Sequence, residues 1–400
     1  MKKLLFITKS IVCGGVERTL LNLLHSLERD KYEIDLLLLE KNGSYLELVP
    51  DDVNIIEAEI PDSLRKVIHC NDLGFKKGLI SILQDKNFFT ALVFLWLTTI
   101  DRFSKLIFKK SFLFRLCSKK TKLPQKTYDV VCDYHGYGYY TTYLASRFKY
   151  SKKFSWIHIE NIDKEFYFAR KTLNQFDGIF GVSPKCLHNF KEKLPCVDSN
   201  KLILLYNLLL KDDILKKSQQ QPLINYKENS RFLIVSIGRL STQKGFDLTI
   251  DTAKVLKDSG RDFLWVIIGE GPERLHLENM IESYGLKDSV ILHGLDINPY
   301  VYLAMADLYV QTSRFEGFAT TLSEAVVLKK PIVSTRFSGV EQQVTDRVNG
   351  FLADFNRIDV SAKIARMMDD SELRQRCAYG NIKINLPTDS TLPILEQCFN

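Results

Sequence analysis

The chain has 400 residues, more than one ordinary hydrophobic core holds, so its length predicts two or three domains. With 45% hydrophobic and 26% charged residues, the composition is that of a folded soluble protein, and the net charge of +7 is too modest to indicate a class of partner by itself. The eight cysteines show no C-x-x-C spacing, which predicts reduced thiols and a cytoplasmic protein. The opening MKKLLFITKS holds only a short apolar run, so it predicts a buried strand rather than a signal peptide.

The first half of the chain alternates apolar strands with helical patterns. KLLFIT at 3–8 predicts a strand, and the glycine turn CGGVE at 13–17 leads into helical apolar spacing at 18–27. EIDLLLL at 33–39 predicts the second strand, so the chain opens as a βαβ unit with glycines at its first strand-to-helix turn. Further short apolar runs follow at 127–134, 153–159 and 178–183. Short apolar runs separated by helices are typical of a parallel sheet.

An insert at about 76–126 interrupts the first domain. Residues 88–100 are apolar, but thirteen residues fall short of the ~20 that a membrane-spanning helix needs. Residues 102–122 carry eight Lys and Arg side chains and no acidic one, interleaved with Phe, Leu and Ile. One interpretation is an interfacial helix pair that binds an anionic membrane surface. The alternative is an ordinary amphipathic helix that packs on the sheet with a solvated basic face.

The periodic apolar pattern ends at residues 207–231, which are mostly polar, so we expect the interdomain linker there. Strand and helix patterns then alternate again, with strands expected at 232–240, 263–269, 290–294, 307–313 and 331–335, and helices at 247–260, 273–285, 300–306 and from about 321. The second half is therefore predicted to be another doubly wound α/β domain of Rossmann type. Two such domains facing each other would form a cleft lined by the carboxyl ends of strands.

Two cations flank a polar turn directly after the first strand of the second half. In SIGRLSTQKGFD, Arg239 and Lys244 stand five residues apart before a helix, so two positive charges meet a helix N-terminus. Such a point suits a diphosphate, because Arg offers a planar fork and Lys a point charge. In the loop GEGPER, Arg274 stands where a dinucleotide fingerprint has its third glycine, which argues against an adenine dinucleotide. The sequence shows no Asp-x-Asp, H-E-x-x-H or Cys/His set at ligand spacing, so neither a metal site nor a cofactor is expected.

The segment SRFEGFATTLSEAVVLKKPIVST at 313–335 holds two glutamates, Glu316 and Glu324, eight positions apart. Thr321 followed three residues later by Glu324 fits a capping box at a helix start, and this interpretation needs no ligand. The alternative is a ligand site, in which the turn after Glu316 directs its N–H groups at an anion and both carboxylates accept hydrogen bonds from ligand hydroxyls.

These motifs, taken together and in this order, resemble the family 4 glycosyltransferases, which are retaining enzymes of the GT-B fold. The resemblance rests on SIGRLSTQKGFD, GEGPER, HGLDINPYVYLAMADLYVQTSRFEGF and the E-x7-E pair with EAVVLKKPIVST, and it runs almost continuously from 233 to about 354. CGGVE and SWIHIEN extend it to the first domain. It implies an α/β GT-B fold of two Rossmann-like, doubly wound domains facing across a cleft, with an acceptor-binding domain at 1–208 and a nucleotide-sugar-binding domain at 209–385. The sequence leaves open whether 386–400 pack back on the first domain.

The resemblance implies a role for individual side chains. Glu316 would bind hydroxyls of the transferred sugar and Glu324 those of the ribose, while Arg239 and Lys244 would hold the diphosphate. His158, in SWIHIEN, matches a position near the reacting sugar, and the alternative is a half-buried histidine satisfied at a strand end. The residues expected to contribute to catalysis are Glu316, His158, Arg239 and Lys244.

Backbone groups are expected to contribute to donor binding as well. The resemblance places three of them against the sugar and the phosphates, namely Gly317, Phe318 and Ala319. Gly14 and Gly15 would approach the donor phosphate closely, which a residue without Cβ permits. LKKP at 328–331 departs from the commonest family pattern, in which small residues precede the proline.

The resemblance implies a retaining, metal-independent hexosyltransferase that moves a sugar from a nucleotide sugar, with UDP as the expected nucleotide, to a lipid-linked or polysaccharide acceptor. The product would be a surface glycan such as capsule, exopolysaccharide or lipopolysaccharide. The departing diphosphate would help take the acceptor proton, so no protein nucleophile is required. Two alternatives are a GT-B-fold nucleotide-sugar epimerase and a non-catalytic, membrane-docked assembly partner. The protein is expected in the cytoplasm, peripheral on the inner face of the cell membrane, with no nucleic-acid partner.

Overall fold

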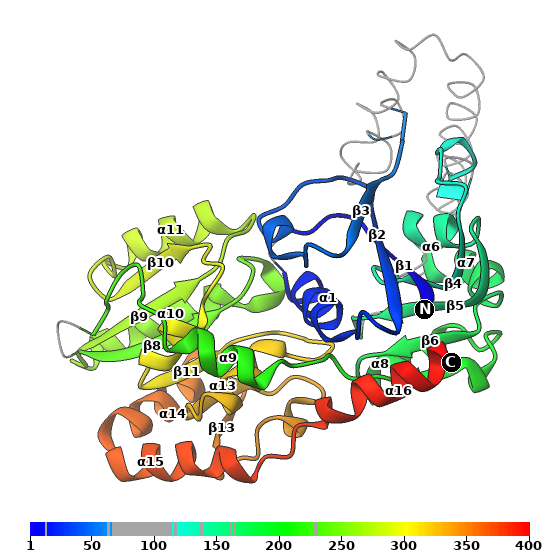
Figure 1. Ribbon diagram of the computed structural model, residues 1–400. Coiled ribbons are helices and arrows are strands. Elements are labelled where there is room, and N and C mark those ends of the chain that lie inside the picture. Colours follow the sequence, from blue (N-terminus) through cyan, green and yellow to red (C-terminus); the bar gives the residue numbers. More distant parts are fainter. Residues whose placement is uncertain are drawn as a thin grey trace, which may run out of the picture. The chain divides into compact units, whose positions relative to one another are not determined.

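The computed structural model describes residues 1–12, 14–61, 65, 114–115, 118–136, 139–160, 162, 165–227 and 231–400, which form two compact units (Figure 1). The first unit comprises Met1–Val12, Leu24–Leu204 and Phe399, and the second comprises Cys13–Leu23, Leu205–Cys398 and Asn400. Most of the insert at 76–126, on which the expectation of a membrane-binding or sheet-packing segment rests, lies outside the described residues. No helix in the described ranges is both long and apolar enough to cross a membrane.

The described strands of the first unit form one parallel sheet. In spatial order they are β3 (Asn54–Glu57), β2 (Tyr32–Leu38), β1 (Lys2–Thr8), β4 (Thr127–Asp133), β5 (Lys149–Ile157), β6 (Gly178–Gly181) and β7 (Leu202–Leu204). In β1, Leu4, Leu5, Phe6 and Ile7 are fully buried. A strand buried on both faces has to be apolar at successive positions, which is why such strands read as continuous apolar runs. The parallel sheet expected for the first half is confirmed.

Helices connect these strands. They are α1 (Gly15–Ser26), α6 (Tyr140–Ala145), α7 (Glu165–Leu173) and α8 (Pro184–Lys193), with 3-10 turns at Leu46–Leu48 and Ser199–Lys201. Helix α1 begins at Gly15, inside the glycine turn expected at 13–17, and its first residues belong to the second unit. Helix α8 has proline at its first position, and the Ser183 side chain caps it by accepting a hydrogen bond from the Cys186 amide.

The second unit contains a parallel sheet whose chain order reverses in the middle. Its strands, in spatial order, are β10 (Val290–Gly294), β9 (Phe263–Ile268), β8 (Phe232–Ile237), β11 (Leu308–Gln311), β12 (Ile332–Thr335) and β13 (Gly350–Ala353). Strands β8 and β11 are neighbours although β9 and β10 lie between them in the sequence. In open α/β sheets, ligands bind at the carboxyl ends of the strands at such a point of reversal.

The helices of the second unit are α9 (Lys211–Ser218), α10 (Phe246–Asp258), α11 (Arg274–Ser283), α12 (Tyr300–Met305), α13 (Thr320–Val327), α14 (Arg357–Asp369), α15 (Ser371–Gly380) and α16 (Thr391–Phe399). Short 3-10 turns occur at Thr242–Lys244, Val340–Gln342, Asn381–Lys383 and Pro387–Ser390. Helix α9 lies inside the polar stretch at 207–231 that was expected to be an interdomain linker, and it buries Ile214. At the end of α16, the Phe399 ring, which belongs to the first unit, contacts the rings of Tyr32 and Phe154.

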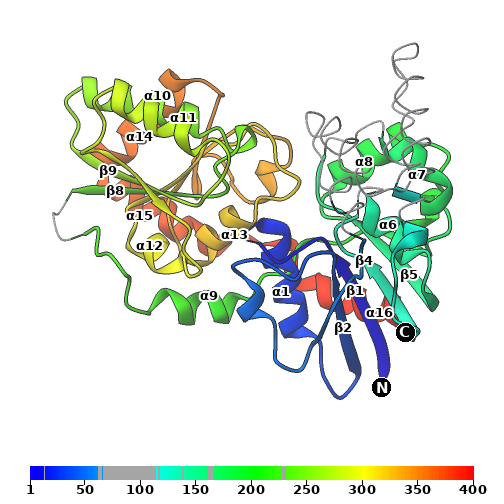
Figure 2. The same ribbon diagram turned by 90° about the horizontal axis from the view of Figure 1, so that it is seen from above.

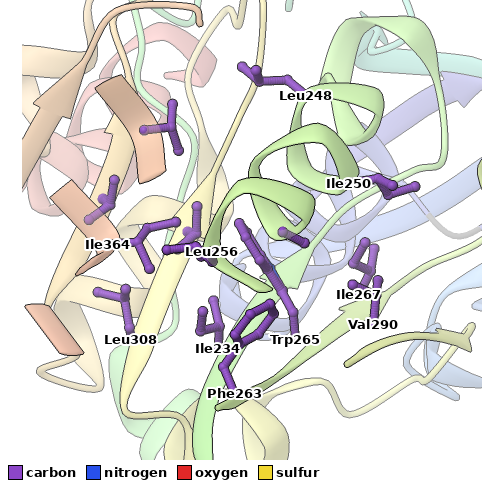
Figure 3. Close-up of a cluster of buried hydrophobic side chains, with 14 of the residues drawn as sticks. Ile234, Leu248, Ile250, Leu256, Phe263, Trp265, Ile267, Val290, Leu308 and Ile364 are labelled. Atoms are coloured by element: carbon purple, nitrogen blue, oxygen red, sulfur yellow. The ribbon is translucent and has the colours of Figure 1, made fainter. Parts of the chain in front are cut away.

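Successive residues of β8 and β9 enter hydrophobic cores on opposite faces of the second sheet. Ile234 and Trp265 pack with side chains of α10 and α14, including Leu256 and Ile364 (Figure 3). Leu233 belongs to a core on the opposite face, to which α12 contributes. Figure 2 shows α10, α11 and α14 on one side of β8 and β9 and α12 on the other. This two-sided burial fixes the carboxyl ends of the strands and the loops that follow them.

Lys330, in the LKKP departure from the family pattern, has a structural role. Its Nζ atom donates to the carbonyl oxygen of Ala306 at 3.0 Å and also to that of Ala304. Both carbonyls lie at the end of α12, where a cation satisfies backbone groups that have no partner within the helix. Burial lowers the pKa of Lys330. The lysine therefore serves as a side-chain cap for the neighbouring helix.

We predict that Lys330→Met lowers the free energy of unfolding by about 1–3 kcal/mol, because two partly buried carbonyls lose a charged donor. The measurement is the urea midpoint of the full chain. Lys329→Met is the matched control, since Lys329 is exposed and its replacement removes the same charge. Equal midpoint shifts in the two variants would contradict the capping role.

Candidate functional site

The loops that follow β8 and β11 meet where the order of the second sheet reverses. Gly245, which ends the 3-10 turn Thr242–Lys244, has φ 66°, and a Cβ there would lie 2.1 Å from the Thr312 carbonyl oxygen. A residue without Cβ is needed for so close an approach. The Arg314 guanidinium joins the same loops by donating to the Asp247 carboxylate at 2.9 and 2.5 Å and to the Thr242 carbonyl oxygen at 2.7 Å. The two loops are therefore held together as one structure.

Glu316 and Lys244 form an ion pair at this junction, with 2.7 Å between Lys244 Nζ and Glu316 Oε1. Their side chains are 8% and 18% exposed, respectively. Three further side chains donate to the same carboxylate, namely Ser313 Oγ at 2.7 Å, Gln243 Nε2 at 3.2 Å and Gln311 Nε2 at 3.3 Å. A carboxylate with donors on several sides is fixed in position and direction.

The structure thus brings together two of the expected site residues, and it places them in direct contact. The sequence had assigned Lys244 to a diphosphate and Glu316 to sugar hydroxyls. Lys244 has three N–H donors and directs one at Glu316, so its remaining donors can serve a phosphate oxygen. The site therefore offers a cationic donor and an anionic acceptor at adjacent points.

Glu324 is buried inside α13 and takes its partner from another helix. It is 4% exposed, and Oε1 accepts a hydrogen bond from the Tyr300 hydroxyl at 3.0 Å. Burial raises the pKa of Glu324, an effect opposed by the positive charges of Arg18 and Lys244 and by the Tyr300 hydrogen bond. The capping-box interpretation is wrong, because α13 has no side-chain cap and Thr321 donates instead to Gln311 Oε1 at 3.0 Å.

Gly317, Phe318 and Ala319 form the turn between Glu316 and the start of α13. The Phe318 ring is buried and contacts the Tyr206 ring edge to face, with 5.5 Å between centroids. The Ala319 carbonyl oxygen accepts a hydrogen bond from Gln343 Nε2 at 2.6 Å. The turn is therefore fixed by side chains from outside the motif.

Arg239 follows β8 with an exposed side chain. The loop that carries it packs against the GEGPER loop, since the Leu240 amide donates to the Glu270 carbonyl oxygen at 2.9 Å. A Cβ on Gly271 would lie 2.2 Å from the Leu240 carbonyl oxygen. This glycine thus serves the close packing of two loops. Arg274 pairs with Glu270, at 2.5 Å.

Residues 14–23 belong to the second unit. A Cβ on Gly15 would lie 3.6 Å from Thr320 Oγ1, at the first position of α13. A Cβ on Gly14 would meet Glu17 Oε2 at 2.3 Å. The two glycines therefore lie at the start of α1, and the second of them is next to the start of α13.

His158 belongs to the first unit, directly after β5. It is buried, and its Nε2 atom lies 2.8 Å from the Tyr134 carbonyl oxygen. The centroids of the His158 and Tyr134 rings are 5.0 Å apart. Burial lowers the pKa of His158 to about 4, an effect opposed by the contact with Tyr134. The imidazole is therefore neutral at physiological pH, and a carbonyl partner requires the proton on Nε2.

Sequence reasoning missed several residues that surround the two glutamates. They are Arg18, Gln243, Tyr300, Gln311 and Ser313. Two of them stand in the polar run Gln311-Thr312-Ser313, which begins at the end of the apolar strand β11. A polar run at the carboxyl end of a buried parallel strand is a signal that could have indicated them.

Residues 218–383 match the family described as Glycosyl transferases group 1. The chain is 28% identical over 191 residues to the alpha-D-kanosaminyltransferase of Streptomyces kanamyceticus, which covers 47% of this chain and 50% of the relative. It is 30% identical over 187 residues to the N-acetylgalactosamine-N,N'-diacetylbacillosaminyl-diphospho-undecaprenol 4-alpha-N-acetylgalactosaminyltransferase of Campylobacter jejuni, which covers 46% and 48%. The lipopolysaccharide core biosynthesis glycosyltransferase LpsD of Rhizobium meliloti is 31% identical over 150 residues, or 37% and 43%. The chain spans about half the length of the curated relatives it matches.

Solved structures extend the likeness to the whole chain. TarM of S. aureus, in complex with fondaparinux, alpha-GlcNAc-glycerol and UDP, matches 100% of both chains with a TM-score of 0.70 at 15% identity. HepE of Anabaena, in complex with UDP and glucose, matches 99% of both chains with a TM-score of 0.68 at 18% identity. The fold is GT-B. The expected α/β class with two Rossmann-like domains is therefore confirmed.

We predict that His158 makes stability depend on pH between 6.5 and about 4. The folded state keeps the ring neutral in this window while the unfolded state binds a proton, so the free energy of unfolding falls as pH falls. His158→Gln retains a donor for Tyr134 and should remove up to about 3 kcal/mol of that fall. Urea unfolding at several pH values measures it. His188→Gln, on the exposed surface of α8, is the control, and a wild-type pH slope in His158→Gln would refute the prediction.

Proposed function

We propose that the protein is a glycosyltransferase of surface polysaccharide biosynthesis that takes its sugar from a nucleotide sugar. The observation that carries the proposal is the contact between Lys244 and Glu316 at the carboxyl ends of β8 and β11. Both residues lie within the segment that matches the glycosyl transferases group 1. The likeness to relatives in lipopolysaccharide, colanic acid and amylovoran biosynthesis supports the class of product.

The chemistry of the site suits a sugar diphosphate. In such a ligand, phosphate oxygens and sugar hydroxyls are neighbours, so recognition needs a cationic donor next to an anionic acceptor. Lys244 and Glu316 provide this pair, and Gln243, Gln311 and Ser313 keep the carboxylate in place. Glu324, in α13, is a second buried acceptor, which we assign to the ribose hydroxyls.

The proposed reaction proceeds with retention and without a metal. As the bond to the sugar breaks, negative charge develops on the departing diphosphate. Arg239, exposed at the end of β8, and Lys244 would stabilise that charge, and Gly14 and Gly15 would let the backbone approach it. His158, as a neutral acceptor, would lie near the reacting sugar.

UDP is the proposed nucleotide, and a lipid-linked or polysaccharide glycan is the proposed acceptor. The complexes of TarM and HepE contain UDP, and the Campylobacter relative is named for a diphospho-undecaprenol substrate. These names support the proposal for this chain by similarity. An epimerase and a non-catalytic partner are less favoured, because the named relatives are glycosyltransferases.

We predict that Glu316→Gln and Lys244→Ala each reduce transfer at least tenfold. Each change removes one member of the charge pair that fixes the sugar and the diphosphate. The measurement is release of nucleoside diphosphate from a panel of nucleotide sugars, with a bacterial lipid extract as acceptor. Lys254→Ala, which removes an exposed lysine of α10, is the control and should retain wild-type turnover. Transfer at the wild-type rate in Glu316→Gln would exclude this site.

We further propose that the protein associates with the inner face of the cell membrane through the segment at about 76–126, which includes the basic and aromatic sequence at 102–122. The eight cations at 102–122 should bind anionic lipid at low salt and release it at high salt. Sedimentation with vesicles of phosphatidylglycerol and phosphatidylcholine measures this. A protein that stays in the supernatant with anionic vesicles at low salt would rule the proposal out.

A further inference from the structure

Arg18 is a buried arginine beside Tyr300, the tyrosine whose hydroxyl contacts Glu324. It belongs to Cys13–Leu23 of the second unit and is 7% exposed. Its Nη2 atom donates to the Ile297 carbonyl oxygen at 2.8 Å, and its guanidinium carbon lies 5.8 Å from the centre of the Tyr300 ring. The Tyr300 hydroxyl in turn donates to Glu324 Oε1 at 3.0 Å. A cation, an aromatic ring and a carboxylate thus follow one another in the interior.

We propose that Arg18 is a positioning residue that keeps Glu324 ionised and oriented to accept hydrogen bonds from the ribose hydroxyls of the nucleotide. The assignment rests on the proposed function, since the ribose is that of the sugar donor. Arg18 acts through Glu324 and Tyr300 and is not itself assigned a contact with the ligand.

The need for such a residue follows from the burial of Glu324. A carboxylate can accept hydrogen bonds from two neighbouring hydroxyls, whereas a protonated carboxyl group uses one oxygen as a donor. Burial favours the protonated form unless a nearby positive charge opposes it. Arginine suits this role because it stays charged at any physiological pH and its planar group packs against aromatic rings.

The other charged or titratable groups around Glu324 are poorer sources of a positive charge than Arg18. Lys244 contributes a positive charge, but its ammonium is 2.7 Å from Glu316, which it must also neutralise. Tyr300 and Tyr309 cannot carry a positive charge, and burial raises the pKa of Tyr309. Glu316 and Glu324 are therefore two buried negative charges near a single lysine. Arg18 supplies the second positive charge that compensates them.

The proximity of α1 to α13 agrees with this arrangement. A Cβ on Gly15 would come within 3.6 Å of Thr320 Oγ1, so the turn that precedes Arg18 lies beside the start of the helix that carries Glu324. The Arg18 amide donates to the Gly14 carbonyl oxygen at 3.0 Å, which closes the first turn of α1. The glycine turn thereby sets the position from which Arg18 enters the interior.

The first test is the pH dependence of UDP binding to the full chain, measured by calorimetry between pH 5 and 8. Arg18→Ala should raise the pH at which half the affinity is lost by about 1 unit, because a nearby opposite charge lowers a carboxyl pKa by about 1–3 units. Arg18→Lys should restore the wild-type midpoint, and Arg357→Ala, which removes an exposed arginine of the same unit, should not move it. Equal weakening by Arg18→Ala at every pH would overturn the proposal.

A second test needs no nucleotide and so separates this inference from the proposed function. Thermal midpoints are compared for Arg18→Ala, Glu324→Gln and the double variant at pH 7. The loss in the double variant should be smaller than the sum of the single losses, because a neutral glutamine no longer needs the cation. Additive losses would overturn the coupling. A wild-type protein that binds no UDP but shows the coupling would refute the UDP assignment and leave the role of Arg18 supported.

Discussion

The direct pairing of β8 with β11 is the constraint on which the candidate site depends. Because the two strands are neighbours, the loops at their carboxyl ends meet, and Gly245 allows them to approach within van der Waals distance. Lys244 from one loop then neutralises Glu316 from the other. Removing either residue would leave the other, largely buried charge without its counter-ion, which is destabilising. The strand order therefore brings together the two loops whose charges neutralise each other.

The buried polar network around Glu316 is not explained by stability alone. Replacing a buried ion pair with apolar side chains of similar volume is often neutral or stabilising, so a protein gains little by keeping one for its fold alone. Here the ion pair is joined by Gln311 and Ser313, and the network lies where the apolar strands of the sheet end. Several donors directed at one carboxylate fix its position, and the proposed recognition of a sugar hydroxyl requires an acceptor that is fixed in this way.

Much of the fold could be predicted because a parallel strand buried on both faces is a continuous apolar run, as in FLIVSI of β8. The polar residues that follow such a run, including Lys244, are then placed at the carboxyl end of the sheet. The capping-box prediction was wrong because Thr321 and Glu324 form hydrogen bonds with residues of β11 and α12. Such tertiary hydrogen bonds have no characteristic residue spacing by which the sequence could reveal them. Arg18 was missed for the same reason, since its partners are distant in the chain. Helix α9 was not predicted because Ile214 is its buried residue, and one buried side chain produces no periodic apolar pattern in the sequence.

In the first unit, the buried carboxylate of Asp133 orders the turn at the end of β4. Asp133 ends β4 in the interior, where burial raises its pKa and the hydroxyls of Thr142 and Ser155 donate to it. This fixes the turn that follows β4, and with it the Tyr134 carbonyl oxygen that contacts His158 Nε2. Since burial keeps the imidazole neutral, the ring carries its proton on Nε2 and its Nδ1 is an acceptor nitrogen. An imidazolium could not accept a hydrogen bond or a proton, so burial preserves the neutral state that the proposed role of His158 near the sugar requires.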